Sequence, residues 1–341
     1  MTDPQLRARL LTGLVIPALP LALDDSRRWS EPHQRALVRY YNSAGAGGLA
    51  VAVHSTQFAI RDPQHALFEP VLRLAAETMN AETAADFVRI AGICGRTPQA
   101  LGEAALAQAL GYHVGLVSPG AWKDAPEEEF LAHCRAVAEV LPVIGFYLQP
   151  AVGGRVFSYD FWRRFADIPR VVAIKIAPFN RYQTNDVIRS VTDSGRTDLA
   201  LYTGNDDAIL TDLLTTWPGG RIIAGGLLGQ WGVWTQRAVQ MLEEVKAART
   251  GDTLASDWLT KNAALTDANA AVFDAAHHFH GCIPGILEVL RRQGLVPTVN
   301  CLDPQEKLSP GQAEELTRVA AAYPWLTDDD FVRKHLSQWL S

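Results

Sequence analysis

The sequence predicts a (β/α)8 TIM barrel followed by a C-terminal helical domain. From about residue 13 to residue 241, short apolar runs alternate with longer amphipathic segments, which is typical of repeated βα units and a parallel sheet. Eight such units in about 230 residues fit a closed barrel better than an open sheet. After the eighth unit the strand pattern stops, while helical spacing of apolar residues continues. We therefore expect a barrel over residues 1–245 and a helical domain over residues 246–341.

Eight apolar runs define the expected strands. They lie at residues 14–19, 48–53, 88–94, 114–118, 143–148, 171–176, 199–202 and 221–224. Apolar residues three and four positions apart predict helices between them, for example over residues 98–110, 127–140 and 159–167. The same spacing predicts C-terminal helices over residues 264–278 and 283–293, with a further helix that opens at residues 309–312.

The composition is that of an ordinary globular protein. The chain has 341 residues, of which 48% are hydrophobic and 20% are charged, so it can bury a large core. Its net charge of −6 argues against a nucleic-acid partner, which would usually require a basic face. The N-terminal segment has no apolar run long enough for a signal or membrane helix. Four widely spaced cysteines indicate reduced thiols, and we expect a soluble, cytoplasmic protein.

Lys175 is the one charged residue in the apolar stretch Val-Val-Ala-Ile-Lys-Ile-Ala-Pro, residues 171–178. Such a run, bounded by prolines, predicts a strand buried on both faces. A buried ammonium group is costly unless it is paired, neutralised or used chemically. Burial lowers the pKa of a lysine, and a neutral amine attacks ketones to form a Schiff base. The alternative is a lysine at a strand end whose amine reaches water.

Polar residues at the expected strand ends are candidates for the site, because the chemistry of such barrels lies where strands end and βα loops begin. Tyr147 lies on the strand before Lys175 and could carry protons, or it could simply fill the barrel. Ser55 and Thr56 could offer hydroxyl and backbone N–H groups to a carboxylate, or form an ordinary turn.

The last two strands end in further candidates. Asn205 and Asp206 follow the seventh strand and could bind substrate, or cap the next helix. Gly225 and Gly226 follow the expected eighth strand, where glycine lets a ligand approach the backbone closely.

Four motifs together resemble the dihydrodipicolinate synthase / N-acetylneuraminate lyase family of Schiff-base pyruvate aldolases, over roughly residues 10–300. Residues 171–175 are similar to the family's lysine strand, and Phe146-Tyr147 followed by Pro150 and Gly153 is similar to its tyrosine motif. Residues 204–207, Gly-Asn-Asp-Asp, resemble its Gly-Asp-Asp/Glu loop. Residues 283–290, Ile-Pro-Gly-Ile-Leu-Glu-Val-Leu, resemble its C-terminal helical signature. The order and spacing of the four motifs are more specific than any one of them.

The resemblance implies a Schiff base between Lys175 and pyruvate or another small 2-oxo acid, with Tyr147 as the proton shuttle and no metal or other cofactor. The family's Gly-Thr-Thr-Gly-Glu loop, which binds the carboxylate, corresponds to residues 53–57, where Ser55 keeps a hydroxyl group. His54 replaces the first threonine, and its imidazole could pass the proton instead or be purely structural. The substrate-binding residues would then be Ser55, Thr56, Gly204, Asn205, Asp206, Gly225 and Gly226.

Two departures from the family pattern concern the second substrate. The arginine that holds the carboxylate of the aldehyde in the synthase corresponds to Val152, and the tyrosine lent across the dimer interface would fall near Gly120-Ala121. The resemblance also implies a homo-oligomer, usually a tetramer. Large apolar residues near the loops, Trp122, Trp231 and Trp234, predict a neutral, apolar or aromatic aldehyde, unless these tryptophans pack helices or the subunit interface.

Three alternatives remain at this point. A dehydratase or hydratase-aldolase would use the same Schiff base, and a non-catalytic 2-oxo acid binding protein would keep the barrel without turnover. A metal-dependent aldolase would need the histidine cluster at residues 277–280, which lies in the helical domain, away from the strand ends.

Overall fold

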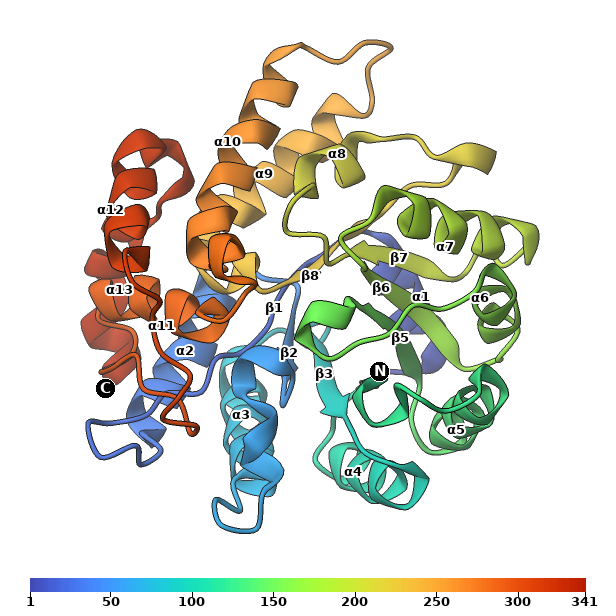
Figure 1. The fold of residues 1–341 in the computed structure, drawn as a ribbon, viewed down its shortest axis with the longest axis horizontal. Helices are drawn as coiled ribbons and strands as arrows, with labels where there is room; N and C mark the ends of the chain where they lie inside the picture. The colour runs from blue at the N-terminus through green and yellow to red at the C-terminus, as the bar shows by residue number, and fades with distance from the viewer.

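Eight parallel strands form the barrel that the apolar runs predict (Figure 1). The computed structural model describes residues 1–341, and its strands are β1 (Val15–Pro17), β2 (Gly48–Val51), β3 (Val88–Ile93), β4 (Val114–Val117), β5 (Val143–Leu148), β6 (Val171–Ala177), β7 (Ala200–Thr203) and β8 (Gly225–Leu228). Each strand pairs with its neighbours in chain order, and β1 pairs with β8. A parallel bridge between Ala18 and Ala50 brings β1 to β2, so the predicted (β/α)8 barrel is confirmed.

The eighth strand differs from the prediction. Residues 221–224 precede it, and β8 instead contains Gly225 and Gly226, which were expected in the loop. A Cβ atom on Gly225 would lie 2.4 Å from the carbonyl oxygen of Leu14, the residue just before β1. A Cβ atom on Gly226 would lie 2.7 Å from the Trp231 ring. Glycine permits this close packing, but its low preference for strands hides the strand in the sequence.

The barrel helices surround the sheet. They are α2 (Glu31–Ser43), α3 (Phe68–Glu82), α4 (Thr97–Ala109), α5 (Glu127–Val140), α6 (Tyr159–Ala166), α7 (Arg181–Asp193), α8 (Ile209–Leu214) and α9 (Thr235–Ala248). The expected helices over residues 98–110, 127–140 and 159–167 match α4, α5 and α6 within one residue at each end. No helix in the chain is both long and apolar enough to cross a membrane.

An additional helix, α1 (Asp3–Leu11), lies at the amino-terminal end of the strands and was not predicted. Its buried face carries Leu6 and Leu10, four positions apart, which pack with the side chains inside the barrel. The hydroxyl of Tyr202 on β7 donates to the carbonyl of Leu10 at 2.8 Å, and Arg7 donates to the carbonyl of Val171 at the start of β6. The helix therefore closes the end of the barrel opposite to the expected site.

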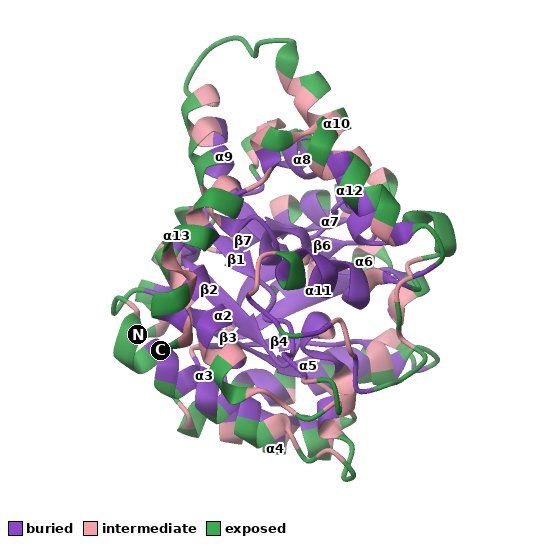
Figure 2. Cartoon of the chain, turned by 90° about the vertical axis from the view of Figure 1, so that its left-hand side faces the viewer, coloured by how far each residue is buried: buried purple, intermediate pink, exposed green.

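Two hydrophobic layers follow from the alternation of side chains along each strand. The inner cluster of 20 buried residues fills the barrel, and the outer cluster of 84 packs the strands against the helices. Along β5, Ile144, Phe146 and Leu148 belong to the inner cluster, while Val143 and Tyr147 belong to the outer one. Figure 2 shows the strands as almost entirely buried, with exposed residues on the outer helix faces.

The C-terminal helices α10 (Asp257–Val272), α11 (Cys282–Arg292), α12 (Gln312–Ala322) and α13 (Asp329–Leu340) lie on one side of the barrel (Figure 1). They share the outer hydrophobic cluster with the barrel, so the core is continuous. The expected division at residue 245 falls inside α9, which ends at Ala248.

The helix predicted over residues 264–278 is placed too far along the chain, because α10 already begins at Asp257. The helix ends at Val272, because the next turns contain left-handed residues, among them Asp274, His278 and Phe279, which break helical hydrogen bonding. The Asp274 carboxylate accepts from the Gly281 amide at 2.9 Å and from the Ser309 hydroxyl, which stabilises this irregular segment.

Candidate active site

A cavity opens at the carboxyl ends of the strands, where the barrel rule places the chemistry. Its walls come from the end regions of six strands, β1, β2, β5, β6, β7 and β8, and from the C-terminal domain. The lining residues are Ala18, Val53, His54, Ser55, Phe146, Leu148, Gln149, Val152, Lys175, Ala177, Phe179, Gly204, Asp206, Gly229, Phe273, Phe279, Cys282 and Ile286. Lys175 is the only lysine or arginine among them, so the cavity is mainly apolar with a small polar centre.

Lys175 points into this cavity from β6. It shares the inner face with Ala173 and Ala177, and it is the one residue of the strand that is not fully buried. Its Nζ atom lies 4.3 Å from the centroid of the Phe146 ring, which faces it from β5. Burial lowers the pKa of Lys175 to about 8, an effect that the Asp206 charge opposes. A substantial fraction of the amine is therefore neutral at slightly alkaline pH.

Tyr147 does not lie where the sequence analysis placed it. Its side chain is on the outer face of β5, 1% exposed, with its ring centroid 5.1 Å from that of Trp162 and 5.8 Å from that of Phe157. The backbone N–H of Phe157 donates to its hydroxyl at 3.3 Å, and burial raises its pKa. Because side chains alternate along a strand, the inward orientation of Phe146 forces Tyr147 outward. The expected contact between Tyr147 and Lys175 is absent.

The turn after β2 divides its polar residues between the cavity and the core. His54 and Ser55 line the cavity, whereas Thr56 is fully buried and donates to the Leu19 carbonyl at 2.6 Å. Burial, together with the charge of Lys175, lowers the pKa of His54 to about 4. The imidazole is thus neutral near pH 7, and no tyrosine lines the cavity with which it could form a proton relay.

The loop after β7 brings two of its three predicted residues to the cavity. Gly204 and Asp206 line it, and a Cβ atom on Gly204 would lie 2.7 Å from Lys175 Cε. Asn205 points elsewhere and is structural: its amide donates to Asp212 at 2.9 Å and its oxygen accepts from the Phe179 amide at 3.0 Å.

Burial raises the pKa of Asp206 to about 7, although the charge of Lys175 acts in the opposite direction. Neither residue forms an ion pair within 4.0 Å. The lysine and the carboxyl group therefore influence each other's pKa from the wall of one cavity without forming a direct ion pair.

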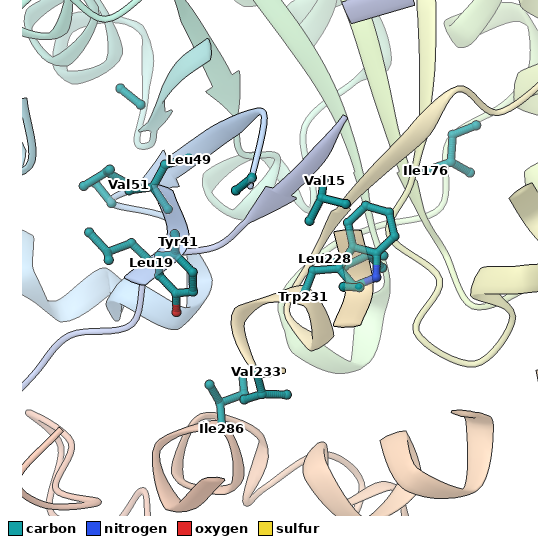
Figure 3. Close-up of a cluster of buried hydrophobic side chains, with 14 of the residues drawn as sticks. Val15, Leu19, Tyr41, Leu49, Val51, Ile176, Leu228, Trp231, Val233 and Ile286 are labelled. Atoms are coloured by element: carbon teal, nitrogen blue, oxygen red, sulfur yellow. The ribbon is translucent and has the colours of Figure 1, made fainter. Parts of the chain in front are cut away.

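The other predicted substrate contacts are only partly present. Val152 lines the cavity, but Gly225, Gly226 and Trp231 do not, and the nearby Gly229 takes their place. Figure 3 shows Trp231 beside Val15 and Leu228, and its side chain is fully buried. Trp122 and Trp234 are also buried outside the cavity, so the aromatic lining comes from other residues.

The residues that the sequence analysis missed are mostly apolar. Phe146, Leu148 and Gln149 come from β5 and its end, and Phe179 follows β6. A second group reaches the cavity from the C-terminal domain: Cys282 and Ile286 on α11, and Phe273 and Phe279 in the segment between α10 and α11. In the sequence, the only signal for this group was the family motif at residues 283–290. A local sequence pattern does not show which distant segment of the chain packs over the barrel.

No group of three or more histidine, cysteine, aspartate or glutamate side chains is arranged to hold a metal ion. Within the histidine cluster, the ring of His277 instead pairs with the carboxylate of Asp274. The arrangement that the metal-dependent alternative requires is therefore not formed.

Comparison with known proteins agrees with the fold and the motifs. A model described as the dihydrodipicolinate synthetase family matches residues 15–322. N-acetylneuraminate lyase 2 from Escherichia coli O6:H1 is 24% identical over 309 residues, which cover 90% of this chain and 92% of the relative. A 4-hydroxy-tetrahydrodipicolinate synthase from Synechococcus elongatus is 29% identical over 155 residues, 45% of this chain and 50% of the relative.

Two solved structures illustrate the shared fold. A prophage protein of the dihydrodipicolinic acid synthase family from Escherichia coli K12, in complex with pyruvate, has a TM-score of 0.75 at 17% identity and covers 91% of this chain and 98% of its own. N-acetylneuraminate lyase from Fusobacterium nucleatum has a TM-score of 0.71 at 15% identity, and the match covers 92% of this chain and 99% of the lyase chain. The family match over most of the chain, the barrel and the four ordered motifs agree: the chain belongs to the dihydrodipicolinate synthetase family.

Proposed function

We propose that this protein is a carbon–carbon lyase, an aldolase in which Lys175 forms a Schiff base with pyruvate or another small 2-oxo acid. The observation that carries the proposal is the position of the Lys175 amine, which opens into an apolar cavity at the strand ends with a lowered pKa. Once formed, the protonated imine withdraws electrons from the neighbouring carbon, so a carbon–carbon bond can form or break there. The proposed chemistry needs no metal or other cofactor.

The 2-oxo acid needs a donor for its carboxylate near Lys175. Ser55 lines the cavity, and its hydroxyl donates to the Ala18 carbonyl over a long 3.3 Å, a weak bond that a charged acceptor can replace. The amide of Gln149 also lies on the cavity wall. We propose that these two groups orient the carboxylate while the ketone carbon faces the amine.

The second substrate is proposed to be a neutral aldehyde with an apolar or aromatic side chain. Val152 stands where the synthase has its carboxylate-binding arginine, and the cavity has no second lysine or arginine. A carboxylate there would lie in a partly desolvated place without a cation, at a cost of about 1–3 kcal/mol. The rings of Phe179 and Phe279, with centroids 5.7 Å apart, offer apolar surface instead.

Borohydride reduction in the presence of pyruvate tests the Schiff base. We expect mass spectrometry to find the reduced adduct on the peptide that carries Lys175, and to find none in the Lys175→Ala variant. Lys261→Ala, on α10 and outside the cavity, is the matched control and should form the adduct normally. An adduct that persists in Lys175→Ala would contradict the proposal, and no adduct with any 2-oxo acid would favour a non-catalytic binding protein.

The aldehyde is tested by competition between partners. Pyruvate is offered with benzaldehyde-type aldehydes, with aspartate semialdehyde and with N-acetylmannosamine, and the rates of aldol formation are compared. We expect the neutral aromatic aldehydes to react fastest. A clear preference for either of the other two would show that the apolar lining does not select the partner.

A further inference from the structure

The proton carrier for the lysine chemistry has to be sought among the cavity residues. Tyr147 lies on the outer face of β5, and the residue opposite Lys175 on that strand is Phe146, whose ring has no proton to give. On β7 the opposite residue is Tyr202, but its hydroxyl donates to the Leu10 carbonyl of α1 and it does not line the cavity. Imine formation nevertheless needs an acid, because the carbonyl oxygen must be protonated before it can leave as water. Another side chain on the cavity wall must supply this proton.

Most polar groups on the wall are poor acids or bases near neutral pH. Burial and the charge of Lys175 lower the pKa of His54 to about 4, so little imidazolium is present. Burial raises the pKa of the Cys282 thiol far above its usual value. The hydroxyl of Ser55 and the amide of Gln149 are not acidic in this range.

The remaining polar group is the carboxyl of Asp206, which is held firmly by its surroundings. Its backbone carbonyl accepts from the Asn269 side chain at 2.7 Å, and its Oδ1 accepts from the Gln230 amide at 3.3 Å. No protein group donates to Oδ2, and no arginine or lysine lies within 4.0 Å. The side chain is only 9% exposed and lines the same cavity as Lys175. One carboxyl oxygen is thus free to exchange a proton with a bound substrate.

We propose that Asp206 is the acid–base residue of this site, taking the role that the family resemblance assigns to Tyr147. The inference rests on the proposed function, because it assigns a proton carrier to the same imine. It concerns how the Schiff base forms and not whether Lys175 forms it.

The proposed steps balance in atoms and charge. The neutral amine of Lys175 attacks the ketone carbon, and a new N–C bond forms as the carbonyl π electrons move to oxygen. That oxygen receives the proton of the Asp206 carboxylic acid, and the carboxylate takes a proton from the attacking nitrogen. Asp206 then returns this proton to the carbinolamine hydroxyl, which leaves as water while the nitrogen lone pair forms the iminium. A neutral amine and a neutral acid have become an iminium and a carboxylate.

The electrostatics of the cavity favour the required starting state. Burial lowers the pKa of Lys175 and raises that of Asp206, so the two values converge. Convergence makes the neutral amine beside the carboxylic acid accessible, whereas in water the proton would stay on the lysine. The other groups acting on this pair are Asp207, which raises the Asp206 pKa, and Cys282, which is itself uncharged near neutral pH.

Asp206→Asn tests the inference through the rate of imine formation. The protein is mixed with pyruvate, trapped with borohydride at timed intervals, and analysed for the Lys175 adduct across about pH 5.5–9.5. We expect the rate to fall by about 10²–10⁴-fold. A purely electrostatic role predicts the opposite, because removing the carboxylate lowers the Lys175 pKa further and leaves more neutral amine to react near pH 7.

Two variants serve as comparisons. Tyr147→Phe removes the outer hydroxyl and should keep the rate within about 3-fold of the unmodified protein, since that hydroxyl does not reach the cavity. Asp206→Glu keeps the acid one methylene further out, so its rate should lie above that of Asp206→Asn and keep the original form of the pH profile. If Asp206→Asn does not fold, the rate and the pH profile of Asp206→Glu still test whether Asp206 is the acid–base residue.

The results separate the inference from the proposed function. An Asp206→Asn adduct that forms at the normal rate, or a Tyr147→Phe variant that is folded but slow, overturns the role of Asp206 while the Lys175 Schiff base stands. The role of Asp206 is also overturned if Asp206→Glu forms the imine as slowly as Asp206→Asn and its rate does not change with pH. Absence of any adduct in the unmodified protein overturns the proposed function itself.

Discussion

Lys175→Met should make the protein more stable while it abolishes the Schiff base. Methionine keeps an unbranched apolar stem of similar length in β6 but removes the buried amine. The Lys175 pKa falls from 10.5 to about 8 on folding, which corresponds to about 3 kcal/mol of unfavourable free energy when the amine is charged. The variant leaves Asp206 without its cation, so that carboxyl stays protonated near pH 7 and offsets part of the gain. We expect a net increase of about 1–3 kcal/mol in the free energy of unfolding at pH 7.

The sign of the pH dependence follows from the direction of the shift. Because the folded-state pKa of Lys175 lies below its unfolded value, the unfolded chain binds the proton more tightly. The penalty in the unmodified protein is full below about pH 8 and disappears as the pH rises toward 10.5. The advantage of Lys175→Met should accordingly shrink by about 2 kcal/mol between pH 7 and pH 9.5.

Urea unfolding of both proteins at the two pH values measures this difference. Lys261→Met is the matched control, since Lys261 forms a partly exposed pair with Asp257 at 3.2 Å and should change stability by no more than about 0.5 kcal/mol. A Lys175→Met variant that is less stable at pH 7, or whose advantage does not depend on pH, would refute the reasoning. Lys175 would then be a structural residue whose charge the fold tolerates at no cost.

Three further predictions concern the cavity and the assembly. Gly204→Ala places a methyl group 2.7 Å from Lys175 Cε and should slow the pyruvate adduct by about 10²-fold in trapping assays; Gly102→Ala, with open space around it, should not. Val152→Arg supplies a cation at the cavity wall and should raise kcat/KM for carboxylate-bearing aldehydes relative to neutral ones by about 10-fold or more; an unchanged ratio would contradict the assigned subsite. Light scattering should give a homo-oligomer, most simply a tetramer, and a mass near 37.3 kDa would count against assembly.

The sequence by itself placed seven of the eight strands, several of the helices around them and the position of Lys175. These features are local: a strand or helix follows from the spacing of apolar residues within one short window, and one lysine in an apolar run is visible without any partner. The order of the motifs identified the family for the same reason. The eighth strand was predicted at residues 221–224 and lies at residues 225–228. Its two glycines, which the tight packing against β1 requires, weaken the strand pattern in the sequence.

Only the tertiary structure decided which side chains meet Lys175. In Val-Ile-Gly-Phe-Tyr-Leu, the sequence of β5, both faces are apolar, so alternation cannot show whether Phe146 or Tyr147 points inward, and a shift of one residue exchanges the faces. The register with β6 settles this, with Phe146 opposite Lys175. Phe273 and Phe279 reach the cavity only because the C-terminal helices pack over the barrel. Contacts between segments about 100 residues apart depend on how whole elements pack, and no local spacing encodes them.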